Sequence, residues 1–302
     1  MERQLRYFLF SFLASATLSS AAHADDYGAC AGANPDLAIA GCTDIIAAAR
    51  DTRSNISIAH YNRGNAYRLK GDYGSAIADY SAAIEQNPLY ADAYSNRGTV
   101  HADMGDHERA IADYNKAIGV SPDSVIAYFN RGRSHHHRGD HDLAIADFDK
   151  VVDLNPAHSG AYLSRGTAYY FKGEYGPAIA DYDKAIDLDP AHAIAYVNRG
   201  NLRGEMGDVD LAIADYDKAI SLKPAHVDAH SRLGEAFGKK GDYDLAIAAY
   251  DKAIGLDPKR GIAYFNRGNA HFQKGNIDYA IADFGKVIRS EERRVGKECR
   301  SR

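Results

Sequence analysis

Apolar residues recur at helical spacing along most of the chain. The segment after residue 72 shows the pattern, with one apolar face formed by Ala76, Ile77, Tyr80, Ala83 and Ile84. A second helical segment precedes it, and the pair Gly71-Asp72 separates the two. Glycine suits the left-handed residue that ends a helix, and aspartate suits the N-cap of the next one. The pattern therefore predicts a pair of helices joined by a tight turn.

This helix pair repeats with a period of 34 residues. Six of the eight prolines mark the period: Pro88, Pro122, Pro156, Pro190, Pro224 and Pro258. Asx-Pro pairs such as Asn87-Pro88 end the second helix of a copy. Seven copies align without a gap, at 57–90, 91–124, 125–158, 159–192, 193–226, 227–260 and 261–289. A unit this small cannot bury its own apolar face, so neighbouring units must stack into an all-α solenoid.

The copies share a motif in each helix. The first helix carries sequences such as YNRGNAY (61–67) and FNRGNAH (265–271), and the second carries AIADYDKAI (178–186 and 212–220). In this 34-residue unit with its Gly, aromatic, Ala and Pro positions, the chain resembles the tetratricopeptide repeat family over about 57–290. The resemblance implies a right-handed superhelical α-solenoid. It also implies a scaffold that binds peptides or proteins in a concave groove, although the family is less specific for function than for fold.

The N-terminus indicates export. Arg3 and Arg6 precede a short apolar run, and Ala22-His23-Ala24 offers a cleavage site for a signal peptide over 1–24. The alternative is a buried N-terminal helix. A signal peptide predicts a periplasmic or extracellular protein of a Gram-negative bacterium.

Export makes a disulfide possible in the mature N-terminal segment, 25–56. Residues 35–48 match the second helix of a repeat, with Cys42 in the place of the aromatic residue. We therefore predict a half repeat that caps the solenoid, closed by a Cys30–Cys42 disulfide. Two buried thiols are the alternative.

The C-terminal segment, 290–302, departs from the repeat pattern. It is basic, contains an unpaired Cys299 and begins where an Asx-Pro stop is expected. It resembles foreign or read-through sequence from a truncated gene, and the alternative is a short basic solvating segment. Without this segment and the signal peptide, the net charge is more negative than the −5 of the whole chain. An acidic array argues against nucleic acid and against anionic membranes as partners of the mature protein.

Two charged series follow the period. An arginine recurs on the first helix and an aspartate on the second, and repeat six lacks both, with Leu233 and Ala249 instead. The joint loss predicts one structural ion pair within each other repeat. The predicted pairs are Arg63–Asp79, Arg97–Asp113, Arg131–Asp147, Arg165–Asp181, Arg199–Asp215 and Arg267–Asp283.

An asparagine series is the stronger functional candidate. It comprises Asn62, Asn96, Asn130, Asn198 and Asn266, with Ser164 and Arg232 as exceptions. Asparagine is a mediocre helix former, and its amide can both donate to and accept from a peptide backbone. The series resembles the asparagine ladder of the O-GlcNAc transferase superhelix. The alternative is a residue that only contacts the neighbouring repeat. Other predicted groove residues are Asn65, Asn201, Asn269, Tyr61, Phe129 and Phe265.

The histidines around residue 136 are a weaker candidate. His136 and His137 would face the edge of the groove, where zinc or copper could bind. Consecutive helical residues point in different directions, so we predict no metal site and no cofactor. The sequence also has no phosphate-binding loop and no nucleophile with a base at suitable spacing.

The sequence thus predicts a non-catalytic scaffold of the cell envelope that holds an extended protein or peptide segment. The alternatives are the recognition arm of a truncated multidomain enzyme and a histidine-dependent metal-binding protein.

Overall fold

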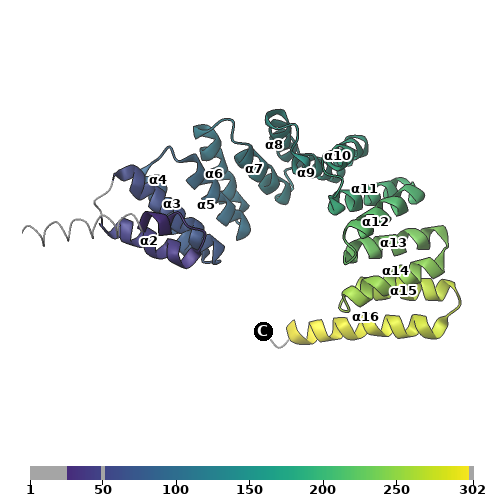
Figure 1. Cartoon of the computed structure of the whole chain (residues 1–302). Coiled ribbons are helices and arrows are strands. Elements are labelled where there is room, and N and C mark those ends of the chain that lie inside the picture. Colours follow the sequence, from purple (N-terminus) through teal and green to yellow (C-terminus); the bar gives the residue numbers. More distant parts are fainter. Residues whose placement is uncertain (1–25, 49–51, 299–302) are drawn as a thin grey trace, which may run out of the picture. The chain divides into compact units, whose positions relative to one another are not determined.

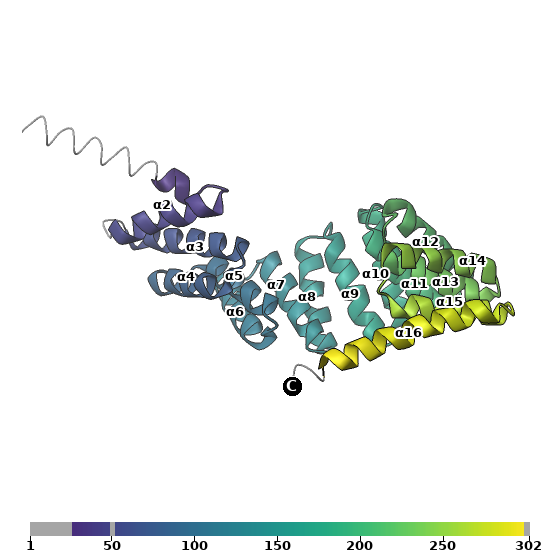
Figure 2. The same ribbon diagram turned by 90° about the horizontal axis from the view of Figure 1, so that it is seen from below.

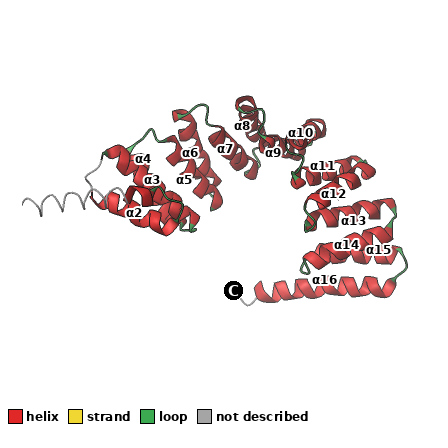
Figure 3. Ribbon diagram, viewed as in Figure 1, coloured by secondary structure: helices red, strands yellow, loops and turns green. Residues whose placement is uncertain are grey.

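The chain is all-α in the part that the structure describes (Figures 1 and 3). The computed structural model describes residues 26–48 and 52–298, which form helices and turns and no strand. The predicted signal peptide lies outside these residues. The chain divides into two compact units, one ending at Leu154 and the other beginning at Asn155. Each unit is a solenoid of tandem helix pairs, which confirms the predicted fold class.

The first unit holds the half repeat and the first three repeats. Its helices are α2 (Pro35–Ala48), α3 (Arg53–Leu69), α4 (Tyr73–Gln86), α5 (Ala91–Asp103), α6 (His107–Val120), α7 (Val125–His137) and α8 (His141–Leu154). The predicted helix of the half repeat, 35–48, has the bounds of α2. Helix α3 begins at Arg53, four residues before the first repeat range taken from the sequence.

The second unit holds repeats four to seven, and its last helices lie side by side in two views (Figures 1 and 2). Its helices are α9 (Ser159–Phe171), α10 (Tyr175–Leu188), α11 (Ala193–Met206), α12 (Val209–Leu222), α13 (Val227–Lys240), α14 (Tyr243–Leu256), α15 (Gly261–Gln273) and α16 (Ile277–Glu298). Helix α16 continues through Ser290, where the repeat pattern ends in the sequence. Within the described residues, no helix is long and apolar enough to cross a membrane.

A glycine with a positive φ recurs in the turn inside each repeat, whereas the aspartate side chain caps the second helix in repeats one and two but not in repeats five and six. Gly71 has a φ of 77°, a conformation that residues with a side chain rarely adopt. The Asp72 side chain then accepts a hydrogen bond from the backbone N–H of Ser75, at 3.1 Å. The Asp72 N–H closes the preceding helix by donating to the Tyr67 carbonyl, at 2.9 Å. These contacts fix the angle between the two helices of a repeat.

The aromatic residue of the second helix forms the centre of each repeat. Tyr80 is fully buried. A Cβ added at Gly64 would lie 2.8 Å from its ring, so only glycine allows the two helices to approach this closely. Val100, on the first helix of the next repeat, completes the same cluster. The core therefore forms only when repeats stack, as the short period requires.

Candidate functional site

The arginine and aspartate of each predicted pair lie in contact within one repeat. Arg131 Nε donates to Asp147 Oδ2 at 2.9 Å, and Arg131 Nη2 donates to Oδ1 at 2.6 Å. The other five predicted pairs have the same bidentate arrangement. The aspartates are buried, and hydrogen bonding to Asp113 raises the pKa of Arg97. In repeat six, Leu233 and Ala249 pack in an apolar cluster instead.

Most of these arginines also contact the preceding repeat. Arg97 Nη1 donates to Ser81 Oγ at 2.9 Å, and Arg199 Nη1 donates to Asp183 Oδ1 at 2.5 Å. The sequence predicted the pairs within one repeat but not this second contact. The arginine series therefore links repeats as well as helices, which is a structural role.

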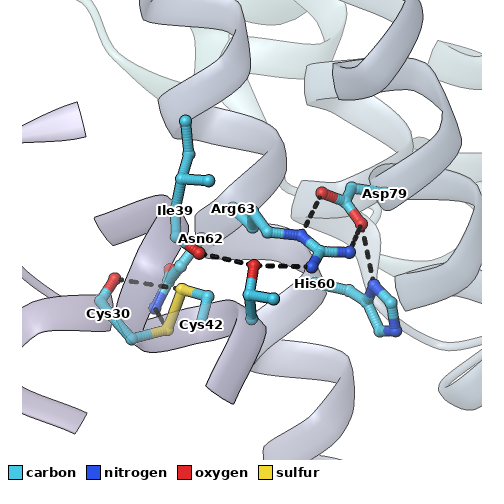
Figure 4. Close-up of a disulfide and its surroundings, with 8 residues drawn as sticks. Cys30, Ile39, Cys42, His60, Asn62, Arg63 and Asp79 are labelled. Atoms are coloured by element: carbon cyan, nitrogen blue, oxygen red, sulfur yellow. Dashed lines mark hydrogen bonds and ion pairs between the residues drawn. A yellow bond between two sulfur atoms is a disulfide. The ribbon is translucent and has the colours of Figure 1, made fainter. Parts of the chain in front are cut away.

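The cysteines of the half repeat form a disulfide (Figure 4). Cys30 and Cys42 are bonded and buried in a cluster with Ile45 and Ala59. Nearby, Arg63 donates to Thr43 Oγ1 at 2.9 Å, so the half repeat and repeat one are linked as two full repeats are. Residues 26–48 thus cover the face of α3 that has no preceding full repeat.

The asparagine series lies between repeats. Asn96 Nδ2 donates to Asn65 Oδ1 at 2.8 Å and to Tyr61 Oη at 3.0 Å, both in the preceding repeat. The other members donate to the preceding repeat or half repeat: Asn62 to Cys30 Sγ (3.9 Å), Asn130 to Thr99 Oγ1 (3.5 Å), Asn198 to Thr167 Oγ1 (3.4 Å) and Asn266 to Glu235 Oε1 (3.1 Å). This is the neighbour contact that the sequence left open as the alternative.

A cavity of about 300 Å³ opens beside this series in the second unit. It is lined by residues of repeats four to six, among them Asn198, Asn201, Gly204, Glu205, Arg232 and Lys239. Its walls combine aromatic and aliphatic groups with amides and charges of both signs, as small binding sites commonly do.

Polar contacts hold the rim of this cavity. Tyr170 Oη donates to Glu205 Oε1 at 2.5 Å, which together with burial raises the pKa of Tyr170 to about 12. Arg232 Nη1 donates to Glu235 Oε2 at 2.9 Å, and Lys239 Nζ donates to the Gly204 carbonyl at 3.1 Å. The contacts of Tyr170 and Lys239 join first helices of successive repeats and hold the rim in place.

A second, more open depression of about 580 Å³ continues along repeats six and seven. It shares Glu235 and Lys239 with the first cavity, and Asn266 and Asn269 also line it. Four predicted groove asparagines therefore lie along one continuous surface. Of the predicted aromatic residues, Phe265 is 45% exposed, whereas Tyr61 and Phe129 pack against other rings, at 4.9 Å from Tyr90 and 5.8 Å from Phe148.

Gly204, Glu205 and Lys239 are among the lining residues that were not predicted from the sequence. A signal for the cavity was present, because the place of Gly204 holds a large side chain in four repeats: Arg68, His136, Tyr170 and Phe272. Repeats five and six have Gly204 and Gly238 there, and each lines one of the two cavities. Two successive glycines at this place thus mark the hollow.

The two candidate histidines have different neighbours. His136 Nδ1 lies 3.2 Å from His141 Nδ1, whereas the His137 ring stacks on His107 with centroids 5.0 Å apart. Burial, with His141 and His137 nearby, lowers the pKa of His136. Among the described residues, no three histidine, cysteine or acidic side chains converge as a metal site.

Comparison with known proteins agrees with this architecture. The profile of the tetratricopeptide repeat family matches residues 95–159, 197–260 and 232–292, which together exceed half of the chain. A second profile, described as TPR repeat, matches 64–105 and 166–207. The chain therefore belongs to the tetratricopeptide repeat family. The fold of this family is typically a non-catalytic scaffold for protein interactions.

Solved structures give the same result. The crystal structure of MamA is 32% identical, covering 55% of this chain and 96% of that chain with a TM-score of 0.52. A tetratricopeptide repeat protein from Parabacteroides merdae ATCC 43184 is 22% identical, covering 78% and 93% with a TM-score of 0.63. YrrB, described as a TPR protein with an unusual peptide-binding site, is 23% identical, covering 61% and 95% with a TM-score of 0.50. The last two support the fold alone. No curated protein sequence matches the chain.

Proposed function

We propose that this protein is an exported, non-catalytic scaffold that holds an extended segment of a partner protein along repeats four to seven. The observation that carries the proposal is the continuous surface formed by the two cavities, which meet at Glu235 and Lys239. An extended peptide offers both polar backbone groups and side chains along its length. A surface with amides at intervals and apolar hollows between them fits such a ligand.

The chemistry of the cavity defines the segment further. The smaller hollow next to Gly204 takes one apolar side chain between Tyr182, Val209 and Ala212. Arg232 and Glu205 on the rim carry opposite charges, so the surface favours a mixed segment over a uniformly acidic or basic one. YrrB, which shares the fold, is described as having a peptide-binding site, and this supports a peptide as the ligand class.

The compartment is part of the proposal. The signal-like residues 1–24 and the Cys30–Cys42 disulfide both support an oxidising location, which is the periplasm or the cell exterior. Fractionation of cells that produce the full chain tests this directly. Recovery of the uncleaved chain in the cytosol, with free Cys30 and Cys42 thiols, would contradict export.

The groove is tested by filling the hollow. A Cβ at Gly204 would meet Ala212 at 3.7 Å and Tyr216 at 3.8 Å, which is ordinary van der Waals contact. Gly204→Phe should therefore keep the fold while its ring occupies the cavity. Gly255→Phe is the matched control, because Gly255 is also helical and a Cβ added there would meet no atom within 4 Å.

Both variants and the parent chain are used to capture partners from envelope extract, and captured segments are then measured as labelled peptides by fluorescence anisotropy. Gly204→Phe should weaken binding by at least tenfold, and Gly255→Phe should bind as the parent does. Equal affinities of the parent and Gly204→Phe, with circular dichroism showing both folded, would refute the proposed site.

A further inference from the structure

Two histidines face each other across the turn of repeat three. His136 lies in the last turn of α7, and His141 is the first residue of α8. Their Nδ1 atoms are 3.2 Å apart, and their ring centroids are 4.9 Å apart with the planes inclined at 51°. The sequence suggested His136 and His137 as the candidate pair. In the structure, the turn places His136 next to His141, five residues along the chain.

The backbone between the two histidines is fixed. Gly139, with a φ of 85°, reverses the chain. Its N–H donates to the His136 carbonyl at 2.9 Å, and its carbonyl accepts from the His141 N–H at 2.9 Å. Asp140 N–H donates to the His135 carbonyl, also at 2.9 Å. The backbone that carries both imidazoles is therefore rigid. Binding of a common atom then costs little conformational entropy.

We propose that His136 and His141 form a two-imidazole site for a divalent transition-metal ion, with Zn²⁺ as the reference ion. A tetrahedral zinc with Zn–N bonds of about 2.0–2.1 Å holds two nitrogens about 3.3 Å apart, close to the observed separation. Imidazole nitrogen suits Zn²⁺, Ni²⁺ and Cu²⁺ and does not suit the hard ions Mg²⁺ and Ca²⁺. The described residues provide no third ligand, so water completes the coordination.

The tautomers of the two rings determine which nitrogens face the ion. In the metal-free protein, one Nδ1–H donates to the other Nδ1. When the ion binds, that proton moves to Nε2 of the same ring, and both Nδ1 lone pairs face the metal.

The charged groups around the pair are of both signs. Helix α7 contributes Arg133, His135 and His137, the turn and α8 contribute Arg138, Asp140 and Asp142, and α6, which packs against α7, contributes His107 and Glu108. Arg138 is paired with Asp140, with Nε and Oδ2 3.4 Å apart. This pairing reduces the positive field that a bound cation would meet.

Repeat four contains a matched pair without metal ligands. Tyr170 and Tyr175 occupy the two corresponding places, and their rings stack with centroids 6.0 Å apart. Aromatic side chains are therefore accepted at both places. The double variant His136→Tyr plus His141→Tyr reproduces the packing of repeat four in repeat three and removes both ligands.

The test is calorimetric titration of Zn²⁺ into tag-free protein at pH 7.5, without reductant, so that the disulfide stays closed. We expect one equivalent of zinc to bind to the parent chain. The double tyrosine variant should weaken this step by at least tenfold, and His137→Gln, the matched single change beside the pair, should leave it unchanged. Circular dichroism checks that each variant is folded, and His141→Gln replaces the double variant if that one is not.

Ring-nitrogen NMR gives an independent readout. Zinc should shift the Nδ1 resonances of His136 and His141, and the shift should disappear when the zinc is removed with EDTA. The proposal is overturned if the parent binds no zinc at millimolar concentration, if the double variant binds as the parent does, or if His137→Gln abolishes binding.

Discussion

The ion pair of repeat three gives the sharpest prediction, because the chain contains its own double variant. Arg131 and Asp147 are joined by two parallel hydrogen bonds, and the Asp147 side chain is only 6% exposed. Repeat six has Leu233 and Ala249 at the same places, packed in an apolar cluster. We therefore compare Arg131→Leu, Asp147→Ala and the two changes together.

The expected magnitudes follow from burial. Arg131→Leu leaves a buried carboxylate without its partner and should lower the free energy of unfolding by about 3–5 kcal/mol. Asp147→Ala should cost less, about 1–3 kcal/mol, because the arginine keeps its hydrogen bond to Asn115 and its place over the Tyr128 ring. The double variant should lie within about 1 kcal/mol of the parent, since apolar replacement of a whole buried pair is often neutral.

The assay is urea unfolding of the full chain by circular dichroism, combined with amide hydrogen exchange in α7 and α8. Hydrogen exchange localises the effect, because repeat arrays do not always unfold in one step. As a converse control, Leu233→Arg and Ala249→Asp in repeat six should each destabilise alone and be better tolerated together. If the two changes in repeat three add without coupling, the pair does not stabilise the repeat as a unit.

Three further predictions concern packing, the disulfide and pH. Gly204→Ala should raise the free energy of unfolding by about 0.5–1 kcal/mol. Gly200→Ala in the same helix should lower it by about 1–3 kcal/mol, because its Cβ would lie 2.8 Å from a ring of α12. Similar thermal melting curves for the two variants would contradict this. Replacing Cys30 and Cys42 by serine should cost about 3 kcal/mol in the first unit, and alkylation of the parent should label two more thiols after reduction than before, so labelling without reductant would exclude the bridge. Burial lowers the pKa of His101, so its contribution to the free energy of unfolding is present above the unfolded pKa of about 6.5 and is lost as the pH falls below it. His101→Tyr, which copies repeats one and four, should make the urea midpoint depend less on pH between about pH 7 and 5. An unchanged pH dependence of the midpoint would refute this.

The repeat period was sufficient to predict the fold. A position such as Gly71 recurs beside an aspartate in copy after copy, so the turn, the cap and the helix pair could be assigned together. The Arg–Asp pairing could also be predicted, because repeat six changes Leu233 and Ala249 at once. Such inferences are possible because two residues that contact each other within one repeat must be kept together or replaced together in each copy.

The cavities could not be predicted in the same way. They form where side chains of successive repeats meet, so their depth depends on distances between repeats that no single copy contains. Gly204 and Gly238 show this, since each is unremarkable within its own helix. Only their succession at one place of the repeat, next to Tyr170, indicates a hollow.

The asparagine series can join neighbouring repeats through its amide nitrogens while its amide oxygens stay available to a ligand. Asn96 uses Nδ2 to donate to Asn65 and Tyr61, so its two amide hydrogens are already engaged. None of the described contacts of Asn96 uses Oδ1, which is the atom able to accept from a peptide N–H. Asn96 would therefore bind an extended segment through its carbonyl oxygen, with the segment as donor.

Replacements in other repeats support the role of the asparagine contact in stacking. Asn65 Oδ1, which accepts from Asn96, also accepts from the hydroxyl of Tyr80 on the second helix, at 2.7 Å. After repeat three, the corresponding places hold Phe148, Arg133 and Ser164, so the hydroxyl, the acceptor and the amide are lost together. This joint replacement fits one shared interaction. In repeat six, Arg232 replaces the amide alone, and Tyr216 still donates to Asn201 at 3.0 Å, so the hydroxyl contact does not depend on the amide.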